Sequence, residues 1–281
     1  MIRPSKHVAK PRDSVVENHV RPLKTKKKKG VIPQSEKIVG SFDECSSSDE
    51  GFIILRHVKS AYTNVFWVRC YRSVRAHHPR ARICIIDDGS DTDYVTDEPL
   101  ENTIIVYSPY RGRGELLPYH YLIHNDWFST AAVIHDSTYL NQPLDFMIDK
   151  YKFLWTFNPS FDRVVQIKQQ MSRLDNSARI LDYYKKNKSI GCFGAMTIIE
   201  RSFLIEVDKV YGIDKLMDAV SGRSHRMDFE RVLGGMLRSM HASKDDVVFG
   251  DIHAWQKWGR AHEKLTERER RLPFVKYWCG R

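Results

Sequence analysis

Residues 81–90 read ARICIIDDGS, and this stretch decides the fold that the sequence predicts. Positions 83–86 are apolar without the alternation of a half-exposed strand, which is typical of a strand buried on both faces of a sheet. The run ends in Asp87 and Asp88 and then in the turn residues Gly89 and Ser90. We therefore predict a central strand over 81–88.

Similar apolar runs lie on either side of this strand, at residues 51–58, 103–108 and 130–136. Helical spacing of apolar residues predicts a helix over 61–77, ended by Pro79, and a second over 112–128 with an irregularity at Pro118. The order strand, helix, strand, strand, helix, strand predicts an α/β fold: a single domain with a mostly parallel sheet flanked by helices.

The second half of the chain is less regular. The patterns there predict a strand at 151–157, helical structure at 161–187, an apolar Gly-containing segment at 189–199, and helices at 200–210 and 227–240, then a strand and a loop over 245–255.

The charge of the chain is unevenly distributed. The net charge of the 281 residues is +10, but residues 1–30 carry +8, residues 31–50 carry −4 and residues 257–281 carry +5. Residues 51–256 are therefore nearly neutral, at +1, which weakens the nucleic-acid function that the pI near 9.3 first suggests. We predict a disordered N-terminal tail (1–50), a folded domain (51–256) and a charged, aromatic C-terminal segment (257–281) that packs on it.

The Lys run at 24–29 fits either a solvated tail or a patch that binds polyanions or directs nuclear import. No apolar run reaches the roughly 18–20 residues of a membrane span, and no apolar stretch of a secretory signal follows the N-terminus. The five cysteines are odd in number and widely spaced, which favours a reducing compartment. We expect a cytoplasmic protein.

Two catalytic patterns do not fit the sequence. His120 and His124 have the i, i+4 spacing of a zinc pair, but residue 121 is Tyr where the zinc-protease motif requires Glu, so we expect no zinc site of that kind. No G-x-S-x-G motif surrounds any Ser, which disfavours a serine hydrolase.

Polar residues that could bind a ligand lie at the ends of two predicted strands. In open α/β sheets ligands bind outside the carboxyl ends of the strands. The strand over 81–88 ends in Asp87 and Asp88, and the strand over 130–136 ends in His135 and Asp136, before Ser137. Such acids can bind a nucleotide or a divalent cation that bridges a diphosphate; the alternative is that they only cap the next turn.

The segment IIDDGSDTD (85–93) resembles the nucleotide-binding turn of GT-A fold, nucleotide-sugar-dependent glycosyltransferases. VIHDS (133–137) lies where that family has its Asp-x-Asp metal motif, but of its three motif positions only Asp136 is acidic. Together with GRGELLPYHYL, GCFGAM, RMDFERVLGGML and FGDIHAW, the pattern is similar to uncharacterised glycosyltransferase-like proteins of large DNA viruses of algae and protists. The resemblance covers residues 51–256 and implies a GT-A-like (Rossmann-like) fold and, for a viral protein, a location in the host cytoplasm.

This resemblance implies roles for individual residues. Glu230, favoured over Asp228, would be the catalytic base that deprotonates the acceptor hydroxyl. The remaining assignments are Asp87, Asp88, Arg111, Arg113 and Arg226 for the donor nucleotide, Asp136, His135 and His253 for a metal ion, and Gly191, Phe193 and Gly194 for the acceptor and sugar side. The alternatives are a plain helix start for Glu230, packing for His253, and turn roles for Gly112 and Gly114.

The expected activity is transfer of a hexose or pentose from a nucleoside diphosphate sugar, with UDP-sugars favoured, to a hydroxyl of a glycan or glycoprotein. We expect inversion at the anomeric carbon and assistance by Mn²⁺ or Mg²⁺. One alternative is a sugar nucleotidyltransferase, which is disfavoured because RHVKSAYTN after the first strand lacks a Gly-rich loop. Another is a nucleic-acid-binding protein that uses its tails and has an inactive transferase-like core.

Overall fold

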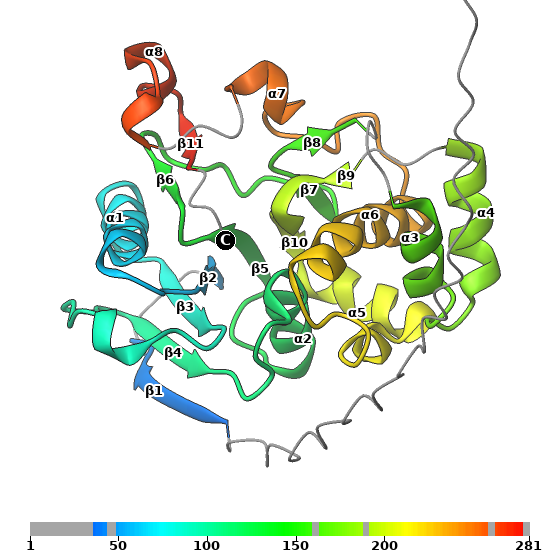
Figure 1. Ribbon diagram of the computed structural model, residues 1–281, viewed down its shortest axis with the longest axis horizontal. Coiled ribbons are helices and arrows are strands. Elements are labelled where there is room, and N and C mark those ends of the chain that lie inside the picture. Colours follow the sequence, from blue (N-terminus) through cyan, green and yellow to red (C-terminus); the bar gives the residue numbers. More distant parts are fainter. Residues whose placement is uncertain (1–35, 44–48, 159–162, 188–190, 258–261, 278–281) are drawn as a thin grey trace, which may run out of the picture. The chain divides into compact units, whose positions relative to one another are not determined.

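The computed structural model describes residues 36–43, 49–158, 163–187, 191–257 and 262–277, and Pro33–Arg281 forms one compact unit. A seven-stranded sheet in the order β1-β4-β3-β2-β5-β10-β7 forms its centre (Figure 1). These strands are β1 (Lys37–Ser41), β2 (Glu50–Arg56), β3 (Arg82–Asp87), β4 (Thr103–Tyr107), β5 (Thr130–His135), β7 (Tyr151–Phe153) and β10 (Thr197–Glu200).

The sheet is mostly parallel. β4, β3, β2 and β5 pair in parallel, whereas β10 runs antiparallel to both β5 and β7, so that β7 again points the same way as β5. Helices flank the sheet (Figure 1). The predicted fold class, an α/β domain with a mostly parallel sheet between helices, is confirmed.

Different helices cover the two faces of the sheet. The helices are α1 (Ala61–His77), α2 (Leu117–His124), α3 (Val164–Met171), α4 (Ser177–Asn187), α5 (Arg201–Tyr211), α6 (Arg223–Met240), α7 (Ile252–Trp255) and α8 (Glu267–Arg270). Side chains of α1 join one buried cluster, and side chains of α2, α5 and α6 join the other. We call the sheet face under α1 the α1 face and the opposite one the α6 face.

Alternation along the strands assigns each side chain to a face. Ile53 and Leu55 of β2 belong to the cluster on the α6 face, and Phe52 and Ile54 to the cluster on the α1 face. The same period of two separates successive residues of β3 and β5, so residues that are adjacent in the chain at a strand end lie on opposite sides of the sheet.

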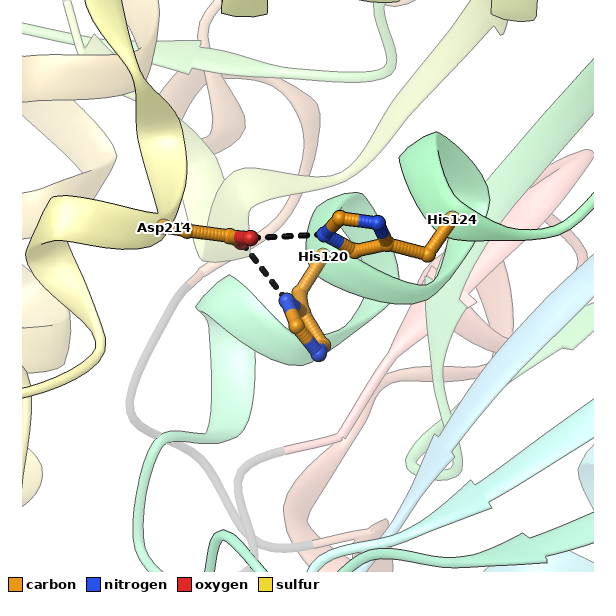
Figure 2. Close-up of side chains that lie close together, drawn as sticks. All are labelled: His120, His124 and Asp214. Atoms are coloured by element: carbon orange, nitrogen blue, oxygen red, sulfur yellow. Dashed lines mark hydrogen bonds and ion pairs between the residues drawn. The ribbon is translucent and has the colours of Figure 1, made fainter.

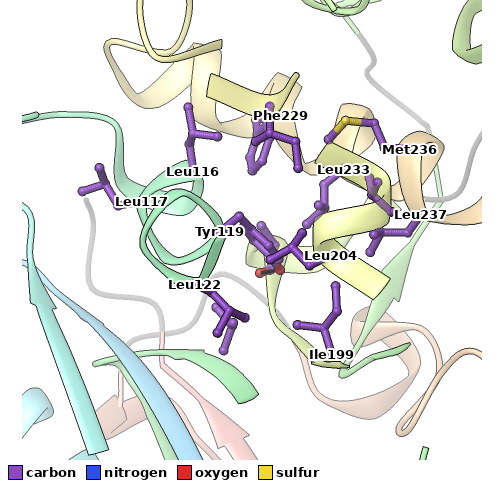
Figure 3. Close-up of a cluster of buried hydrophobic side chains, with 14 of the residues drawn as sticks. Leu116, Leu117, Tyr119, Leu122, Ile199, Leu204, Phe229, Leu233, Met236 and Leu237 are labelled. Atoms are coloured by element: carbon purple, nitrogen blue, oxygen red, sulfur yellow. Dashed lines mark hydrogen bonds between the residues drawn. The ribbon is translucent and has the colours of Figure 1, made fainter. Parts of the chain in front are cut away.

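On the α6 face, leucines and aromatic residues of α2, α5 and α6 interdigitate above the sheet (Figure 3). Leu117, Leu122, Leu204, Leu233 and Leu237 are all 0% exposed. Tyr119 is fully buried among them, and its hydroxyl donates to the carbonyl oxygen of Ala195 at 2.7 Å. This packing fixes the position of α6 over the sheet.

Short elements complete the structure. They are the strands β6 (Thr138–Leu140), β8 (Thr156–Phe157), β9 (Gly191–Cys192) and β11 (Phe274–Lys276), and the 3-10 helices η1 (Thr92–Tyr94), η2 (Gly114–Leu116), η3 (Phe193–Ala195), η4 (Ile213–Leu216) and η5 (His262–Lys264). β11 pairs with β6, and β8 pairs with β9.

Three predicted elements are shorter than expected. The helix predicted over 112–128 is η2 followed by α2, because Gly112 and Gly114 adopt φ of 82° and 45° and keep the chain out of the α-helical region. The stretch 161–187 contains α3 and α4, with Asn176 at φ 47° between them. The strand predicted over 151–157 is split into β7 and β8, which pair with β10 and β9.

The predicted tail contains a strand. β1 runs antiparallel to β4 from Lys37 to Ser41, although all five residues are exposed, because an edge strand is held by backbone hydrogen bonds and needs little apolar burial. Residues 1–35, including the Lys run at 24–29, and 44–48 lie outside the described residues. Over the described part of the chain, no helix is both long and apolar enough to cross a bilayer.

Candidate functional site

The carboxyl ends of β2, β3 and β5 meet at one edge of the sheet, as the parallel pairing requires. The ion pair at the α1 side of this edge is buried. Arg56 donates from Nε to Asp87 Oδ2 at 2.7 Å, and the two side chains are 1% and 5% exposed. The other carboxylate oxygen of Asp87 accepts from the backbone N–H of Ser90 at 2.8 Å. Asp87 thus caps its own turn and neutralises a buried guanidinium.

Asp88 lies on the α6 side and fastens a loop. Its Oδ1 accepts from the N–H of Gly112 at 2.6 Å, and its Oδ2 accepts from the N–H of Gly114 at 3.1 Å. Asp88 is only 2% exposed. A ligand bound at this edge would therefore contact the 110–114 loop that Asp88 holds, and not Asp88 itself. Burial raises the pKa of the Asp88 carboxyl to about 6, against the opposing hydrogen bond from Gly112 and the charge of Arg226.

Arg226, in the first turn of α6, contacts two carboxylates of this region. Its Nη1 lies 3.5 Å from Asp88 Oδ2, and its Nε lies 3.1 Å from Glu115 Oε2. The other carboxylate oxygen of Glu115 lies 3.9 Å from His135 Nε2, at the end of β5. Two acids therefore flank one guanidinium at the carboxyl edge of the sheet, and a histidine lies beside one of these acids.

Glu230, one turn further along α6, faces the same region. Its carboxylate accepts a hydrogen bond from the backbone N–H of Gly194. Although part of the side chain reaches the surface, the carboxyl group is desolvated, and this burial, with the negative charge of Glu115 nearby, raises its pKa well above the usual range. A raised pKa makes the ionised carboxylate a stronger proton acceptor, which suits a general base.

Gly194 brings His135 next to this group. It has φ 63°, in the left-handed region, and a Cβ built on it would lie 3.0 Å from Cε1 of His135. We call the side chains of Asp88, Glu115, His135, Arg226 and Glu230, together with Gly194, the edge cluster. Asp88 directly follows β3, and the other members come from η2, β5, α6 and η3; these residues are up to 142 positions apart in the chain.

Asp228 belongs elsewhere. It is 3% exposed, its Oδ2 lies 3.3 Å from Nη1 of Arg163, and it lines a groove between α3 and α6. Positions i and i+2 of a helix point to different sides, so the structure does not bring Asp228 together with Glu230.

The three predicted metal ligands are not gathered either. Asp136 is fully buried and accepts from the backbone N–H of His57 at 2.8 Å. His135 faces Glu115, whereas His253 is an exposed residue of α7 whose N–H donates to Asp251. Within the described ranges, the group of three or more His, Cys, Asp or Glu side chains with close ligand atoms is instead His120, His124 and Asp214.

The remaining predicted residues differ in their exposure and in their contacts. Arg111 is exposed and its side chain lies against Gly89, while Arg113 donates to the carbonyl oxygen of Met217 at 2.9 Å. A Cβ on Gly191 would lie 2.0 Å from Nη1 of Arg231, so a glycine is needed there for packing. Phe193 is 8% exposed and its ring packs edge-on against Phe157.

Three residues of this region were not predicted. Glu115 follows the Gly-Arg-Gly loop, and its charge beside that loop was the available signal. His57 donates its backbone N–H to Asp136, and its Nδ1 lies 2.8 Å from the carbonyl oxygen of Asp88. Lys276 of β11 is 4% exposed and its ammonium donates to the Ser137 hydroxyl. Nothing local in its segment distinguishes this lysine from the other basic residues of the C-terminal segment.

No family model matches the sequence, and no curated protein matches it. Among solved structures, the X-ray structure of the mannosyltransferase Ktr4p from S. cerevisiae is similar over 76% of this chain and 72% of that chain, with 9% identity and a TM-score of 0.40. A likeness of this size leaves the function to be argued from the residues of this chain.

Proposed function

We propose that the protein is a glycosyltransferase that transfers a sugar from a nucleoside diphosphate donor to a hydroxyl group of a glycan. The observation that carries the proposal is the edge cluster: a carboxylate with a raised pKa, a guanidinium and a histidine at the carboxyl edge of a parallel sheet. Ligands of open α/β sheets bind at this edge.

In the proposed reaction, Glu230 accepts the proton of the acceptor hydroxyl as that oxygen bonds to the anomeric carbon of the donor sugar. The bond from the anomeric carbon to the diphosphate oxygen breaks, and the diphosphate leaves with its electron pair. Arg226, with Arg111 on the adjacent loop, favours this step because a positive charge stabilises the departing phosphate oxygens. Attack on the face opposite the leaving group would invert the configuration at the anomeric carbon.

The donor nucleotide would lie against the 110–114 loop, which the buried Asp88 positions. Gly191, Phe193 and Gly194 would border the sugar and the acceptor, since the N–H of Gly194 already orients Glu230. We favour a UDP-sugar donor. The assay below distinguishes transfer of a hexose from transfer of a pentose.

A divalent ion fits part of this arrangement. Mg²⁺ and Mn²⁺ are commonly held by one or two protein ligands together with substrate phosphates, and the pair Glu115 and His135 offers one oxygen and one nitrogen at the cluster. These two residues would hold the ion, which would supply further neutralisation of the diphosphate charge. The buried Asp136 lies on the opposite side of the sheet and stays a predicted ligand only. His253 stays a predicted ligand.

The loop after β2 disfavours a nucleotidyltransferase. Such an enzyme would cradle phosphates with free backbone N–H groups directly after its first strand. Here the N–H groups of all four residues from His57 to Ser60 already donate to the side chains of Asp136, Ser90 and Thr63. The residues of the basic tail needed for a nucleic-acid function lie outside the described part.

The proposal is tested with the full-length protein in a panel of UDP-, GDP- and dTDP-sugars, each with and without Mn²⁺. A donor that binds only the native state raises the melting temperature, by an amount equivalent to about 2.7 kcal/mol at 100 times its Kd. Mass spectrometry then follows transfer to glycan acceptors. Failure of every sugar nucleotide to shift the melting temperature, together with no detectable transfer, would refute the proposal.

A further inference from the structure

Three potential metal ligands converge on the surface between α2 and η4, outside the edge cluster. Asp214 bridges two histidines: its Oδ1 lies 2.6 Å from Nδ1 of His120, and its Oδ2 lies 2.6 Å from Nε2 of His124 (Figure 2). One ligand atom from each residue lies within 4.8 Å of the others. A carboxylate and two imidazoles are a donor set that Zn²⁺ prefers.

The backbone holds each of these side chains in place. His120 and His124 are four residues apart on α2, so both imidazoles lie on one face of that helix, with ring centroids 4.8 Å apart. Asp214 comes two residues after Gly212, which ends α5 at φ 62°, and one after Ile213, which is 0% exposed. The donor set is therefore organised before any ligand binds, which lowers the entropic cost of binding.

An ion can reach the group from solvent. The side chains of His120, His124 and Asp214 are 14%, 50% and 43% exposed, so one side of the group is open and can take a water molecule as a fourth ligand. The ammonium of the adjacent Lys215 is bound to Asp175, so this positive charge already has an anionic partner.

The geometry requires only a small adjustment. In a tetrahedral zinc site with bonds of about 2.0–2.2 Å, neighbouring ligand atoms are about 3.4 Å apart. The present separations of 2.6 Å are those of hydrogen bonds. A shift of Asp214 by about 1 Å, away from the helix, would open the space that the ion needs.

We infer that His120, His124 and Asp214 form a Zn²⁺ site, completed by one water molecule, that ties α2 to η4. The site is structural in character and independent of the proposed transferase activity. It differs from the zinc-protease pattern that the sequence excluded, because no Glu follows His120 and the third ligand comes from a segment 90 residues beyond His124. The rings of His120 and Tyr110 form a T-shaped pair with centroids 5.4 Å apart, so a bound ion would also stiffen the loop that Asp88 fastens.

The test titrates ZnCl₂ into the full-length, tag-free protein after treatment with EDTA and dialysis, followed by calorimetry. We expect binding of one ion at this site and a higher melting temperature. His124→Ala and Asp214→Asn should each weaken this binding at least tenfold. Cobalt supplies a second measurement that needs no variant: Co²⁺ at a site with two imidazoles and a carboxylate gives the visible absorption of a tetrahedral complex.

His241→Ala is the matched control. His241 also pairs with an aspartate, Asp149, at 3.1 Å, but this pair lacks a second histidine. Its replacement should leave the zinc affinity and the cobalt spectrum unchanged. Absence of zinc binding, zinc binding that is equal in wild type and in both ligand variants, or a cobalt spectrum of octahedral type would each overturn the inference, and the three residues would then form only a hydrogen-bonded tie.

Discussion

Asp87 and Asp88 are neighbours in the chain, but they serve opposite sides of the sheet. On the α1 side, Asp87 has one buried partner of opposite charge, Arg56, and a backbone N–H for its second oxygen. On the α6 side, Asp88 shares a single guanidinium with Glu115, and Glu230 lies nearby with its pKa raised.

The difference separates structural charges from reactive ones. In a buried ion pair with matched partners, each group stabilises the charged form of the other. Both charges are then neutralised within the pair, so they contribute little to binding a ligand. A cluster with more acids than bases raises carboxyl pKa values and leaves an unbalanced charge, which is typical of functional sites. We therefore expect substitutions on the α1 side to change stability, and substitutions on the α6 side to change activity.

The largest effect is expected at Glu230. Glu230→Gln removes the proposed base and retains the size of the side chain, so transfer should fall by roughly 10²–10⁴-fold. The thermal shift with the donor should persist. Glu206→Gln, on the exposed side of α5, is the control and should retain full activity. Transfer at the wild-type rate in Glu230→Gln would remove this residue from the mechanism.

Asp87→Asn tests the α1 side. Without the carboxylate, Arg56 becomes an uncompensated buried charge, and we expect the free energy of unfolding in urea to drop by about 3–5 kcal/mol. Asp182→Ala, which breaks the exposed pair with Lys186, should cost less than about 1 kcal/mol. A similar small loss for Asp87→Asn would mean that this ion pair does not have the structural role assigned to it.

The raised pKa of Asp88 predicts a pH effect on stability. Because the native state binds the proton more tightly than the unfolded state, the contribution of Asp88 to stability should fall as pH rises from about 4 to about 6. A native-state pKa of about 6 for Asp88 corresponds to a contribution of about 3 kcal/mol at most. Unfolding curves across this range should be less pH-dependent in Asp88→Asn than in wild type, with the exposed Asp91→Asn as the control that retains the wild-type slope.

A smaller effect is expected for Arg226→Gln. Loss of one charge-assisted interaction with the diphosphate should cost about 1.5–3 kcal/mol in transition-state stabilisation, measured as kcat/KM. Arg201→Gln, a control on α5 that contacts the carbonyl oxygens of Leu122 and Ile123, should leave kcat/KM unchanged. Equal kcat/KM in Arg226→Gln and wild type would place the diphosphate elsewhere.

Local features of the chain predicted much of the fold. The helix over 61–77 has the predicted bounds because Ser60 and Thr63 form a capping box at its start and Pro79 follows its end. The four parallel strands were found within one or two residues of their ends, since each is a continuous apolar run. β1 was not predicted, because its five exposed residues carry no apolar pattern.

The site was predictable only in part. Strand ends marked Asp87, Asp88 and His135 as candidates, but whether each one is structural or exposed to a ligand depends on what packs above it. The residues that contact Glu115 and Lys276 come from distant segments of the chain. Asp214 contacts His120 and His124 because it follows the end of α5.

Apolar periodicity and turn residues act over a few positions, so the amino-acid order alone determined the four parallel strands, most helices and the α/β class. Charge balance around a carboxylate depends on groups within several ångströms, whatever their distance in the chain. For this reason only the tertiary structure determines that Arg56 neutralises Asp87 and that two histidines share one aspartate. It also determines that burial beside Glu115 raises the pKa of Glu230.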